Sequence, residues 1–580
     1  MAAKTTISLL LLALCCSVNA HGRVPQQDVH MENLRWAEDS SITVSVTPTT
    51  ITTPTGWVTV SFSGVSNPAS DDWIGVFSPS TVNFYTTSPI KYQFAQVSPT
   101  YLTTGSGSLN FQLINMHTNV VFVFMRNGTS YPDYAAKSPY VEFSNYNYPM
   151  QGHLAVTKNV GEMRVSWAIG LTNMDQYVQY GTKSGSYSKT VTASSTTYTT
   201  ADMCGSPATG YGWKAPGYLQ TAVLSGLSAN TRYYYRYGSN QSGWSDEYHF
   251  VSAPNVGPSV GVSFIAFGDM GKGEVDGSVE HWEEQPSLNT TQNMLNLVND
   301  GSMDLILHIG DISYAVGYAS QWDEFMQQIL PVATQVPYMT CIGNHERDYP
   351  HSGCYYNGTD SGGECGVPYE LRFIMPGTEN EPDEPWYSFD YGNVHFLLMS
   401  TEHNFQIGSD QYNWIESDLA SVDRTKTPWV VFGGHRPMYI DSTNTGGYTS
   451  DQQVAAFMRE NLEPLLLKYQ VNLALWGHNH SYQRTCAVYN LTCQTAATSN
   501  EVYPTHVVIG MAGYGLTHLL QNPQPSYFVY TDDQEYGYTT ITTTESTLTM
   551  QFYNNDNQLR DEFTLTNPVA NKSSYNVVIN

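Results

Sequence analysis

A series of continuous apolar runs in the second half of the 580-residue sequence places the strongest constraint on its fold. The runs occupy residues 262–267, 305–309, 338–342, 394–399, 429–432 and 471–476. Such runs are typical of strands that are buried on both faces. Stretches with helical periodicity lie between them at residues 292–298, 321–330, 411–419 and 451–469, and Pro464 is expected to kink or divide the last. We therefore expect an α/β domain with layered β-sheets flanked by helices.

Two strand-rich regions precede this domain. Residues 21–147 contain short alternating runs between clusters of Pro, Gly, Ser and Asn, and predict an N-terminal β-sandwich. Residues 148–253 continue in the same way, with Trp167 in an early strand and a Tyr-rich run at 232–237. This second region resembles a fibronectin type III-like module, which has similar core markers. We expect its tyrosines to form core and a half-exposed face rather than a ligand platform.

The α/β domain is expected to span residues 261–525. Alternating strands return at 538–566, so residues 526–580 are expected to complete its sheet. Hydrophobic residues make up 41% of the chain and aromatic residues 13%, which is enough apolar surface to bury several cores.

The first twenty residues have the pattern of a secretory signal peptide. Lys4 precedes an apolar stretch at 7–18, and Val18-Asn19-Ala20 offers a small-residue cleavage site. The stretch is shorter than a membrane span, which needs about 20 apolar residues, and no later stretch is long enough either. We expect a secreted protein, with cell wall and vacuole as further destinations. Glycosylation sequons fit this route at Asn127, Asn240, Asn289, Asn357, Asn490 and Asn571.

Six cysteines remain after residue 20, and an oxidising compartment allows them to pair. The pairs Cys354–Cys365 and Cys486–Cys493 would each close a short polar loop, and we expect these two disulfides. Cys341 lies in an apolar run, where it is either a buried free thiol or a partner of Cys204.

The charge balance argues against a nucleic-acid partner. Lys and Arg number 24 against 51 Asp and Glu, which gives a formal net charge of -27. General phosphate-backbone binders need a basic surface to release counterions.

Five apolar runs end in a glycine-containing turn that carries Asp, Asn, Tyr or His. The turns are Gly268-Asp269, Gly310-Asp311 with Tyr314, Gly343-Asn344-His345, Gly433-Gly434-His435 and Gly477-His478-Asn479-His480. A single polar residue after a strand is commonly a cap, but five in succession at strand ends indicate a site. Asn479 also forms a sequon, which we discount because it lies between two candidate ligands.

These turns supply seven potential ligands: Asp269, Asp311, Tyr314, Asn344, His435, His478 and His480. Seven donors are too many for one octahedral ion with an open position, but they suit two ions that share a bridging carboxylate. A tyrosinate favours a hard ion such as Fe(III), whereas two imidazoles and an amide oxygen suit a divalent ion, with Zn, Mn and Fe(II) all admissible.

The five turns resemble the metal-binding signature of the purple acid phosphatases, within the wider calcineurin-like metallophosphoesterase fold. The resemblance implies that Asp269, Tyr314 and His480 bind one metal, that Asn344, His435 and His478 bind the other, and that Asp311 bridges them. It also implies that Asn344 and His345 contact the substrate. His345 is the candidate general acid, and its alternative role is to orient Asn344.

The implied activity is hydrolysis of phosphate monoesters by in-line attack of a metal-bound hydroxide, without a covalent intermediate. Further blocks at 72–79, 360–368 and 421–424 resemble the long plant-type subgroup that includes nucleotide pyrophosphatase/phosphodiesterase-like members. The expected partners are therefore small phosphate esters or nucleotides, and a homodimer is also admissible.

One segment departs from the family pattern. Many plant members carry a His-His pair shortly after the ligand equivalent to His435, whereas residues 439–445 here read Tyr-Ile-Asp-Ser-Thr-Asn-Thr. This departure allows an enzyme specialised for diesters or pyrophosphates. A separate alternative is a non-catalytic extracellular binding protein on a phosphatase scaffold, which lost ligands would support, and none of the seven is missing. Arg347, Arg436 and His403 are candidates for phosphate contact or, equally, for structural ion pairs.

Overall fold

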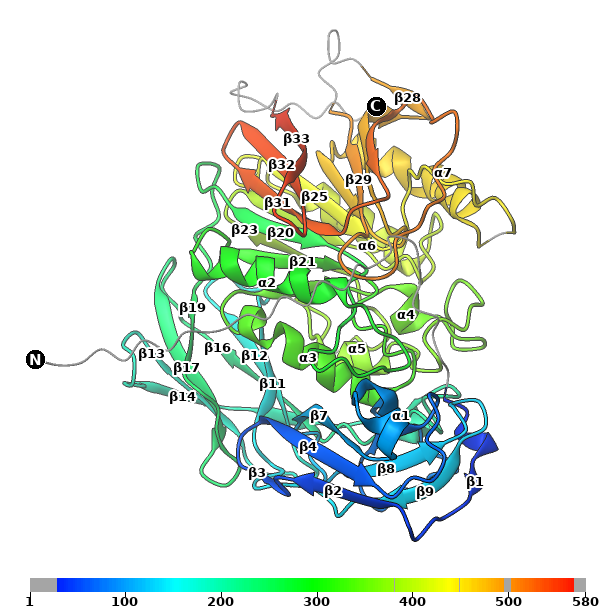
Figure 1. Ribbon diagram of the computed structural model, residues 1–580. Helices are drawn as coiled ribbons and strands as arrows, with labels where there is room; N and C mark the ends of the chain where they lie inside the picture. The colour runs from blue at the N-terminus through cyan, green and yellow to red at the C-terminus, as the bar shows by residue number, and fades with distance from the viewer. Residues whose placement is uncertain (1–28, 380, 448, 495–501, 568–580) are drawn as a thin grey trace, which may run out of the picture.

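The computed structural model describes residues 29–379, 381–447, 449–494 and 502–567. The proposed signal peptide and Asn571 lie outside these residues. Two β-modules pack against one α/β domain, and they are drawn in blue and cyan below it in Figure 1. None of the described helices is long and apolar enough to cross a membrane.

The first module is a β-sandwich, as predicted. One sheet has the order β1-β9-β8-β5-β6 and faces the sheet β2-β4-β7, with β10 and β3 paired at the side. Alternating side chains such as Val60, Phe62 and Phe111 are buried between the sheets. The strands are β1 (Arg35–Trp36), β2 (Thr43–Thr47), β3 (Thr50–Ile51), β4 (Thr55–Ser63), β5 (Trp73–Phe77), β6 (Lys91–Phe94), β7 (Gly107–Ile114), β8 (Val121–Arg126), β9 (Asp133–Lys137) and β10 (Glu142–Phe143), and the short helix α1 covers Tyr101–Thr104.

The second module is also a two-sheet sandwich. Trp167 stacks on Tyr237 with ring centroids 5.3 Å apart, and Tyr233 and Tyr235 are buried beside them. Tyr234 is half-buried on the other face, so the Tyr-rich run is core and half-exposed face, as predicted. The strands are β11 (Met150–Ala155), β12 (Met163–Ile169), β13 (Tyr177–Gly181), β14 (Lys189–Thr192), β15 (Ser194–Thr196), β16 (Tyr218–Leu224), β17 (Arg232–Ser239), β18 (Gly243–Trp244) and β19 (Tyr248–Val251).

The α/β domain has two facing sheets with helices outside them. The first sheet has the order β22-β21-β20-β31-β32-β33, and the C-terminal strands extend it because β31 pairs antiparallel with β20. The second has the order β23-β24-β25-β26-β29-β27-β28, with β30 on β27. Phe264 of the first sheet meets Phe396 of the second edge-on at 5.1 Å. The strands of the first sheet are β20 (Ser263–Phe267), β21 (Leu305–Ile309), β22 (Tyr338–Cys341), β31 (Gly537–Thr543), β32 (Thr547–Asn554) and β33 (Leu559–Thr566).

The strands of the second sheet are β23 (Tyr387–Tyr391), β24 (Val394–Leu398), β25 (Trp429–Gly434), β26 (Leu473–Trp476), β27 (Tyr482–Tyr489), β28 (Thr492–Cys493), β29 (Thr505–Ile509) and β30 (Phe528–Asp532).

Helices cover the outer face of each sheet. Helices α2 (Pro286–Asn299) and α3 (Ala319–Ala333) pack on the first sheet, and α6 (Asp410–Ser421) and α7 (Asp451–Lys468) on the second. Pro464 lies inside α7 without dividing it. The short helices α4 (Asn344–Arg347) and α5 (Val367–Arg372) follow β22.

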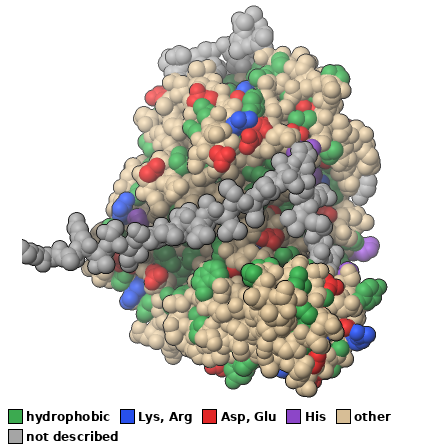
Figure 2. Space-filling view, in the orientation of Figure 1, with side chains coloured by type: hydrophobic (Ala, Val, Ile, Leu, Met, Phe, Trp, Pro, Cys, Tyr) green, Lys and Arg blue, Asp and Glu red, His purple; other side chains and the backbone are tan. Residues whose placement is uncertain are grey.

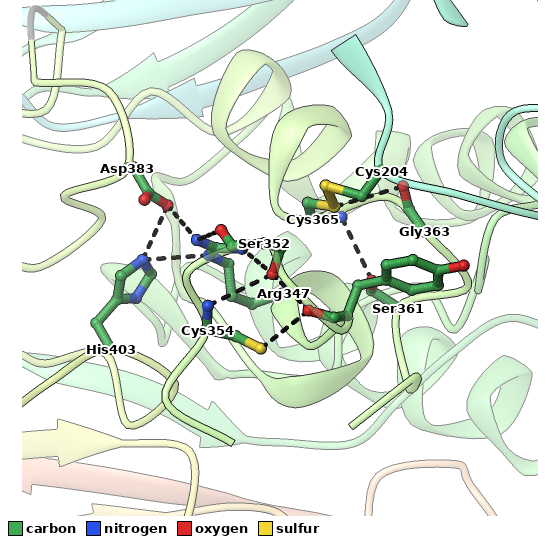
Figure 3. Close-up of a disulfide and its surroundings, with 10 residues drawn as sticks. Cys204, Arg347, Ser352, Cys354, Ser361, Gly363, Cys365, Asp383 and His403 are labelled. Carbon is green, nitrogen blue, oxygen red and sulfur yellow. Dashed lines mark hydrogen bonds and ion pairs between the residues drawn. A yellow bond between two sulfur atoms is a disulfide. The ribbon is translucent and has the colours of Figure 1, made fainter. Parts of the chain in front are cut away.

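One predicted disulfide is wrong. Cys365 pairs with Cys204 rather than with Cys354, across 161 residues (Figure 3). The reason is the docking of a second-module loop, since Cys204 N–H donates to Gly363 O at 2.8 Å and Ala208 N–H to Gly362 O at 3.1 Å. The pair Cys486–Cys493 is confirmed, and Cys341 is a buried free thiol.

The described surface shows where basic side chains and the predicted sequons lie. Figure 2 shows Lys and Arg side chains scattered over the described part of one face, without a broad basic patch there. The sequon residues Asn127, Asn240, Asn289, Asn357 and Asn490 are exposed, whereas Asn479 is buried.

Candidate metal centre

The five predicted turns meet at one end of the two facing sheets. Asp269 follows β20, and Asp311 and Tyr314 follow β21, whereas Asn344 begins α4 directly after β22. His435 follows β25 of the second sheet, and His478 and His480 follow β26. Strands β20, β21 and β22 are parallel, as are β25 and β26, so their carboxyl ends lie along shared edges.

Several donors stand on unusual backbone conformations. Asp269, Asp311, Tyr314 and His478 have φ values of 59°, 49°, 51° and 68°, in the left-handed region that L-residues seldom adopt. Such conformations persist where the surrounding structure fixes them, and they cluster at functional sites. Here they turn the side chains sharply back from the strand ends.

Two of the preceding glycines are required by close approach. A Cβ on Gly310 would lie 2.4 Å from His435 Nδ1, and a Cβ on Gly343 would lie 2.2 Å from Asp311 Oδ1. Any side chain at these positions would displace a donor residue, which explains why glycine precedes the polar residue there.

One group of donors surrounds the Asn344 carbonyl. Asn344 Oδ1 lies 2.9 Å from His435 Nε2 and 3.0 Å from His478 Nδ1. Donor atoms of Asp311, His435 and His478 lie within 4.8 Å of one another, a spacing that can hold a metal ion. The sequence predicts one metal at this place.

The second group surrounds the Tyr314 hydroxyl. This oxygen lies 3.2 Å from His480 Nε2 and 3.3 Å from Asp269 Oδ1. His480 Nε2 in turn lies 3.5 Å from Asp269 Oδ1. Tyr314 and Asp269 are completely buried, so their polar atoms are held away from solvent.

Asp311 lies between the two groups. Its Oδ2 is 3.1 Å from His435 Nε2 and 3.4 Å from the Tyr314 hydroxyl. All seven predicted donors therefore converge on one buried place, with Asp311 in the position expected of a bridging carboxylate.

The hydrogen bonds behind these donors show that the site fits cations. His435 Nδ1 donates to Ile309 O at 3.1 Å, so Nε2 of the neutral ring presents a lone pair. Asn344 Nδ2 donates to Asp360 Oδ2 at 3.1 Å, which directs Oδ1 toward the same point. Once Nε2 has lost its proton, an imidazole nitrogen, an amide oxygen and a carboxylate face one another as acceptors, an arrangement that a shared metal cation satisfies.

His480 is oriented in the same way as His435, because its Nδ1 donates to Gly515 O at 2.8 Å and its Nε2 faces the Tyr314 hydroxyl.

The pKa shifts report the same excess of negative charge. Burial alone would lower the pKa of His435, but the carboxylates of Asp311 and Asp269 raise it to about 10. Burial raises the pKa of Tyr314 well above its usual range, and Asp269 and Asp311 add to the effect. Without a cation, therefore, the negative charge of Asp269 and Asp311 favours a proton on both His435 and Tyr314. A bound metal ion would take the place of those protons.

His345 stands at the edge of the donor group. Its backbone N–H donates to Asp311 Oδ1 at 3.0 Å, and its ring Nδ1 donates to Asp360 O at 3.1 Å. The ring Nε2 lies 3.9 Å from Asp311 Oδ2. His345 is half-buried, so it reaches the site from the solvent side.

Sequence reasoning missed three residues that support the site. The carboxylate of Glu346 accepts the backbone N–H groups of Asp311, Ile312 and Gly343 at 3.0, 2.7 and 3.0 Å, and so joins two turns. Asp360 orients both Asn344 and His345. Tyr514 stacks on Tyr314 with ring centroids 4.3 Å apart. The Asn-His-Glu turn was the available signal for Glu346, whereas Tyr514 lies in a loop without a motif.

The three further candidates for phosphate contact have protein partners. Arg436 is buried and donates to Glu402 at 2.9 Å and to Asp348 at 3.1 Å. Arg347 contacts Ser352 and Asp383, and His403 contacts the same Asp383 (Figure 3). These contacts agree with structural ion pairs.

Residues 439–441, which begin the segment that departs from the family pattern, are packed into the α/β domain. Tyr439 donates its hydroxyl to Glu463, and Asp441 accepts Gln521 N–H at 2.9 Å. Both residues are buried, and residues 443–447 after them are exposed.

Comparisons with known proteins cover nearly the whole described chain. Family models match residues 42–145 (Fn3-like domain from purple acid phosphatase), 149–252 (purple acid phosphatase, N-terminal domain), 262–482 (calcineurin-like phosphoesterase) and 503–562 (iron/zinc purple acid phosphatase-like protein C).

Individual relatives agree with these matches. The chain is 39% identical to the "Probable inactive purple acid phosphatase 1" of Arabidopsis thaliana, over 95% of this chain and 93% of that protein. It is 38% identical to a "Nucleotide pyrophosphatase/phosphodiesterase" of Hordeum vulgare, over 56% of this chain and 88% of that protein. The solved structure of purple acid phosphatase PPD1 from yellow lupin seeds is similar with a TM-score of 0.84 and 36% identity, over 91% of this chain and 96% of that one.

Proposed function

Because the chain belongs to the purple acid phosphatase family, we propose that it is an active acid phosphatase that hydrolyses phosphate monoesters at a binuclear centre. The observation that carries the proposal is the convergence of all seven donor side chains, with acceptor atoms facing one another around Asn344 and Asp311. If selection on the metal site had been lost, replacement of some donors would be expected, but all seven are present.

Each donor has a place in this proposal. Asp269, Tyr314 and His480 would hold Fe(III), and Asn344, His435 and His478 would hold Zn, Mn or Fe(II), with Asp311 shared. When bound, the two cations supply charge that makes water acidic and neutralises the phosphoryl oxygens. Glu346 and Asp360 keep the donors aimed at these positions through the hydrogen bonds described above.

His345 is proposed to act on the leaving group. Its Nδ1–H is committed to Asp360 O, so Nε2 is the atom that faces the site. When the ring is protonated at both nitrogens, Nε2 can pass its proton to the leaving oxygen as the P–O bond breaks. Asn344 and His345 would also contact the substrate phosphate.

The test is a set of assays on the metal-loaded protein at acidic pH. We expect hydrolysis of p-nitrophenyl phosphate, and its loss in Asp311→Asn. His345→Asn should slow hydrolysis of an alkyl phosphate by about 10²-fold or more, but that of p-nitrophenyl phosphate less, because p-nitrophenolate needs little protonation to leave. Equal effects on both substrates would remove His345 from the acid role.

A second candidate function is cleavage of phosphodiesters or nucleotide pyrophosphates at the same site. The similarity to the barley nucleotide pyrophosphatase/phosphodiesterase favours it. Bis(p-nitrophenyl) phosphate and ADP in the same assays decide between the two. A protein that binds metal but cleaves none of the three substrates would instead be a scaffold, in line with the "probable inactive" name of the Arabidopsis relative.

We further propose that the protein enters the secretory route and is secreted. Two disulfides and five exposed sequon asparagines support this. Treatment with an endoglycosidase should raise the electrophoretic mobility of protein taken from its natural source, and unchanged mobility would contradict the proposal.

A further inference from the structure

A recess of about 360 Å³ opens beside the donor group and has no part in the chemistry proposed above. Its volume falls in the range of small-molecule pockets, roughly 300–1,000 Å³. The lining includes Pro207, His281, Trp282, Tyr318, Tyr349 and Thr359. The recess therefore combines flat rings with a few polar groups.

Trp282 connects the recess to the site. Its ring centroid lies 6.2 Å from that of His345 and 5.8 Å from that of Tyr514. Tyr514 stacks on the predicted ligand Tyr314. The recess therefore adjoins His345, the residue proposed to act on the leaving group.

The chemistry of the walls favours a flat apolar ring. Trp282, Tyr318 and Tyr349 are only partly buried, so their rings are available to solvent. Tyr318 stacks on His281 with ring centroids 3.6 Å apart, which holds that wall in one orientation. Aromatic rings pack well against other rings, in stacked or edge-on contacts that stabilise binding beyond the area they bury.

The opposite wall is supplied by the second β-module and is fixed in place. Ser206 and Pro207 follow Cys204, whose disulfide to Cys365 joins that module to the α/β domain (Figure 3). Gly205 lets this loop approach closely, since a Cβ there would lie 2.0 Å from the Tyr349 hydroxyl. The recess is therefore preorganised, which reduces the entropy cost of binding.

We propose that this recess is a leaving-group subsite that binds the aromatic ring of a phosphate ester, from either an aryl or a nucleoside leaving group. The proposal rests on the proposed phosphatase function and names its substrate class. Trp282 is the specificity-determining residue, and Tyr349 and the loop that carries Pro207 form the facing wall.

The first experiment compares substrates on the metal-loaded protein. The ratio of kcat/KM for phenyl phosphate to that for glycerol 2-phosphate is measured in wild type, Trp282→Ala and Trp282→Phe, because a ratio across variants cancels the intrinsic reactivity of each ester. We expect the ratio to fall about tenfold in Trp282→Ala and to be largely restored in Trp282→Phe. Trp57→Ala, which removes an exposed ring in the first module, is the control and should leave the ratio unchanged.

The same ratio with AMP in place of phenyl phosphate distinguishes a nucleoside ring from an aryl ring. A drop with either aromatic ester supports the subsite. Ratios for both esters that stay within about twofold of wild type, a change below 0.5 kcal/mol, would overturn it while leaving the phosphatase function intact.

The second experiment does not depend on turnover. Calorimetry measures the affinities of phenylphosphonate and methylphosphonate. Wild type should bind the phenyl compound more tightly, and Trp282→Ala should bind the two compounds with equal affinity. If neither phenyl phosphate nor glycerol 2-phosphate is hydrolysed, the proposed function fails, and this binding preference still decides the subsite. Equal affinities in wild type, or no binding of either compound, would overturn the subsite.

Discussion

Single residues at the site hold strained conformations that neighbouring groups must maintain. Left-handed backbone at a non-glycine residue costs on the order of 1–3 kcal/mol. At Asp311 the Glu346 carboxylate offsets this cost by accepting the N–H groups of Asp311 and Ile312. Burial and the nearby Asp311 carboxylate raise the pKa of Glu346 to about 8, although the backbone N–H groups of Ile312 and Gly343 favour its charged form. Glu346 is therefore a positioning residue rather than a ligand.

Glu346→Gln should weaken the metal site. The amide replaces one acceptor oxygen with an N–H₂ donor, so at least one backbone N–H loses its partner. We expect metal affinity to fall about 10–100-fold, measured by equilibrium competition with a chelator of known affinity. Glu247→Gln, on the exposed surface of the second module, is the matched control, and equal affinities in the two variants would contradict this role.

Tyr314→Phe should remove the visible absorption of the iron-loaded protein. Only the phenolate oxygen can give a charge-transfer band with Fe(III), and phenylalanine keeps the packing against Tyr514. The absorption spectrum of the purified variant checks this, with circular dichroism as the test of folding. A folded variant with unchanged colour would place Tyr314 outside the metal site.

At the scale of elements, a buried histidine links the second sheet to its covering helix. His395 on β24 contacts Asp390 of β23 at 2.7 Å and Asp418 of α6 at 2.9 Å. Burial alone would lower the pKa of His395, but the two carboxylates raise it to about 9. The folded protein thus binds this proton more tightly than the unfolded chain, whose histidine has a pKa near 6.5.

The stability from this link is complete below about pH 6.5 and is lost as the pH rises through about 9. His395→Gln should therefore lower the apparent unfolding free energy by about 2 kcal/mol at pH 6, with a smaller difference at pH 9.5. Thermal unfolding of both proteins across this pH range is the measurement. A difference independent of pH would show that His395 contributes by packing alone.

Elements and donors were predictable where local signals agree with the fold. Apolar runs marked β20, β21, β22, β24, β25 and β26, and glycine turns marked all seven donors, because strand burial and sharp turns depend on nearby residues. The Cys204–Cys365 disulfide was not predictable, since it depends on how a loop of the second module docks. Glu346, Asp360 and Tyr514 escaped detection for the same reason: their roles exist only after distant turns have met.

At the scale of the molecule, buried charges join the first module to the α/β domain. Lys91 on β6 lies 2.6 Å from Glu274 and 2.9 Å from Asp276, and its side chain is 4% exposed. These carboxylates belong to the segment between β20 and α2, which also carries Trp282. The first module therefore supports the segment that forms one wall of the recess.

Lys91→Met should destabilise this junction strongly. Removal of one partner from a buried ion pair leaves uncompensated charge, at a cost of about 3–5 kcal/mol. We expect a lower apparent Tm than in the control Lys137→Met, which removes an exposed lysine of the same module. A Tm equal to that of the control would mean that the modules are held together by other contacts.

The metal content of the purified full-length protein shows whether the five distant turns build the proposed two-cation centre. Elemental analysis after gel filtration should find two metal ions per chain, one of them iron, and loss of metal in Asp311→Asn. One ion per chain, or two ions retained by Asp311→Asn as firmly as by wild type, would contradict the account.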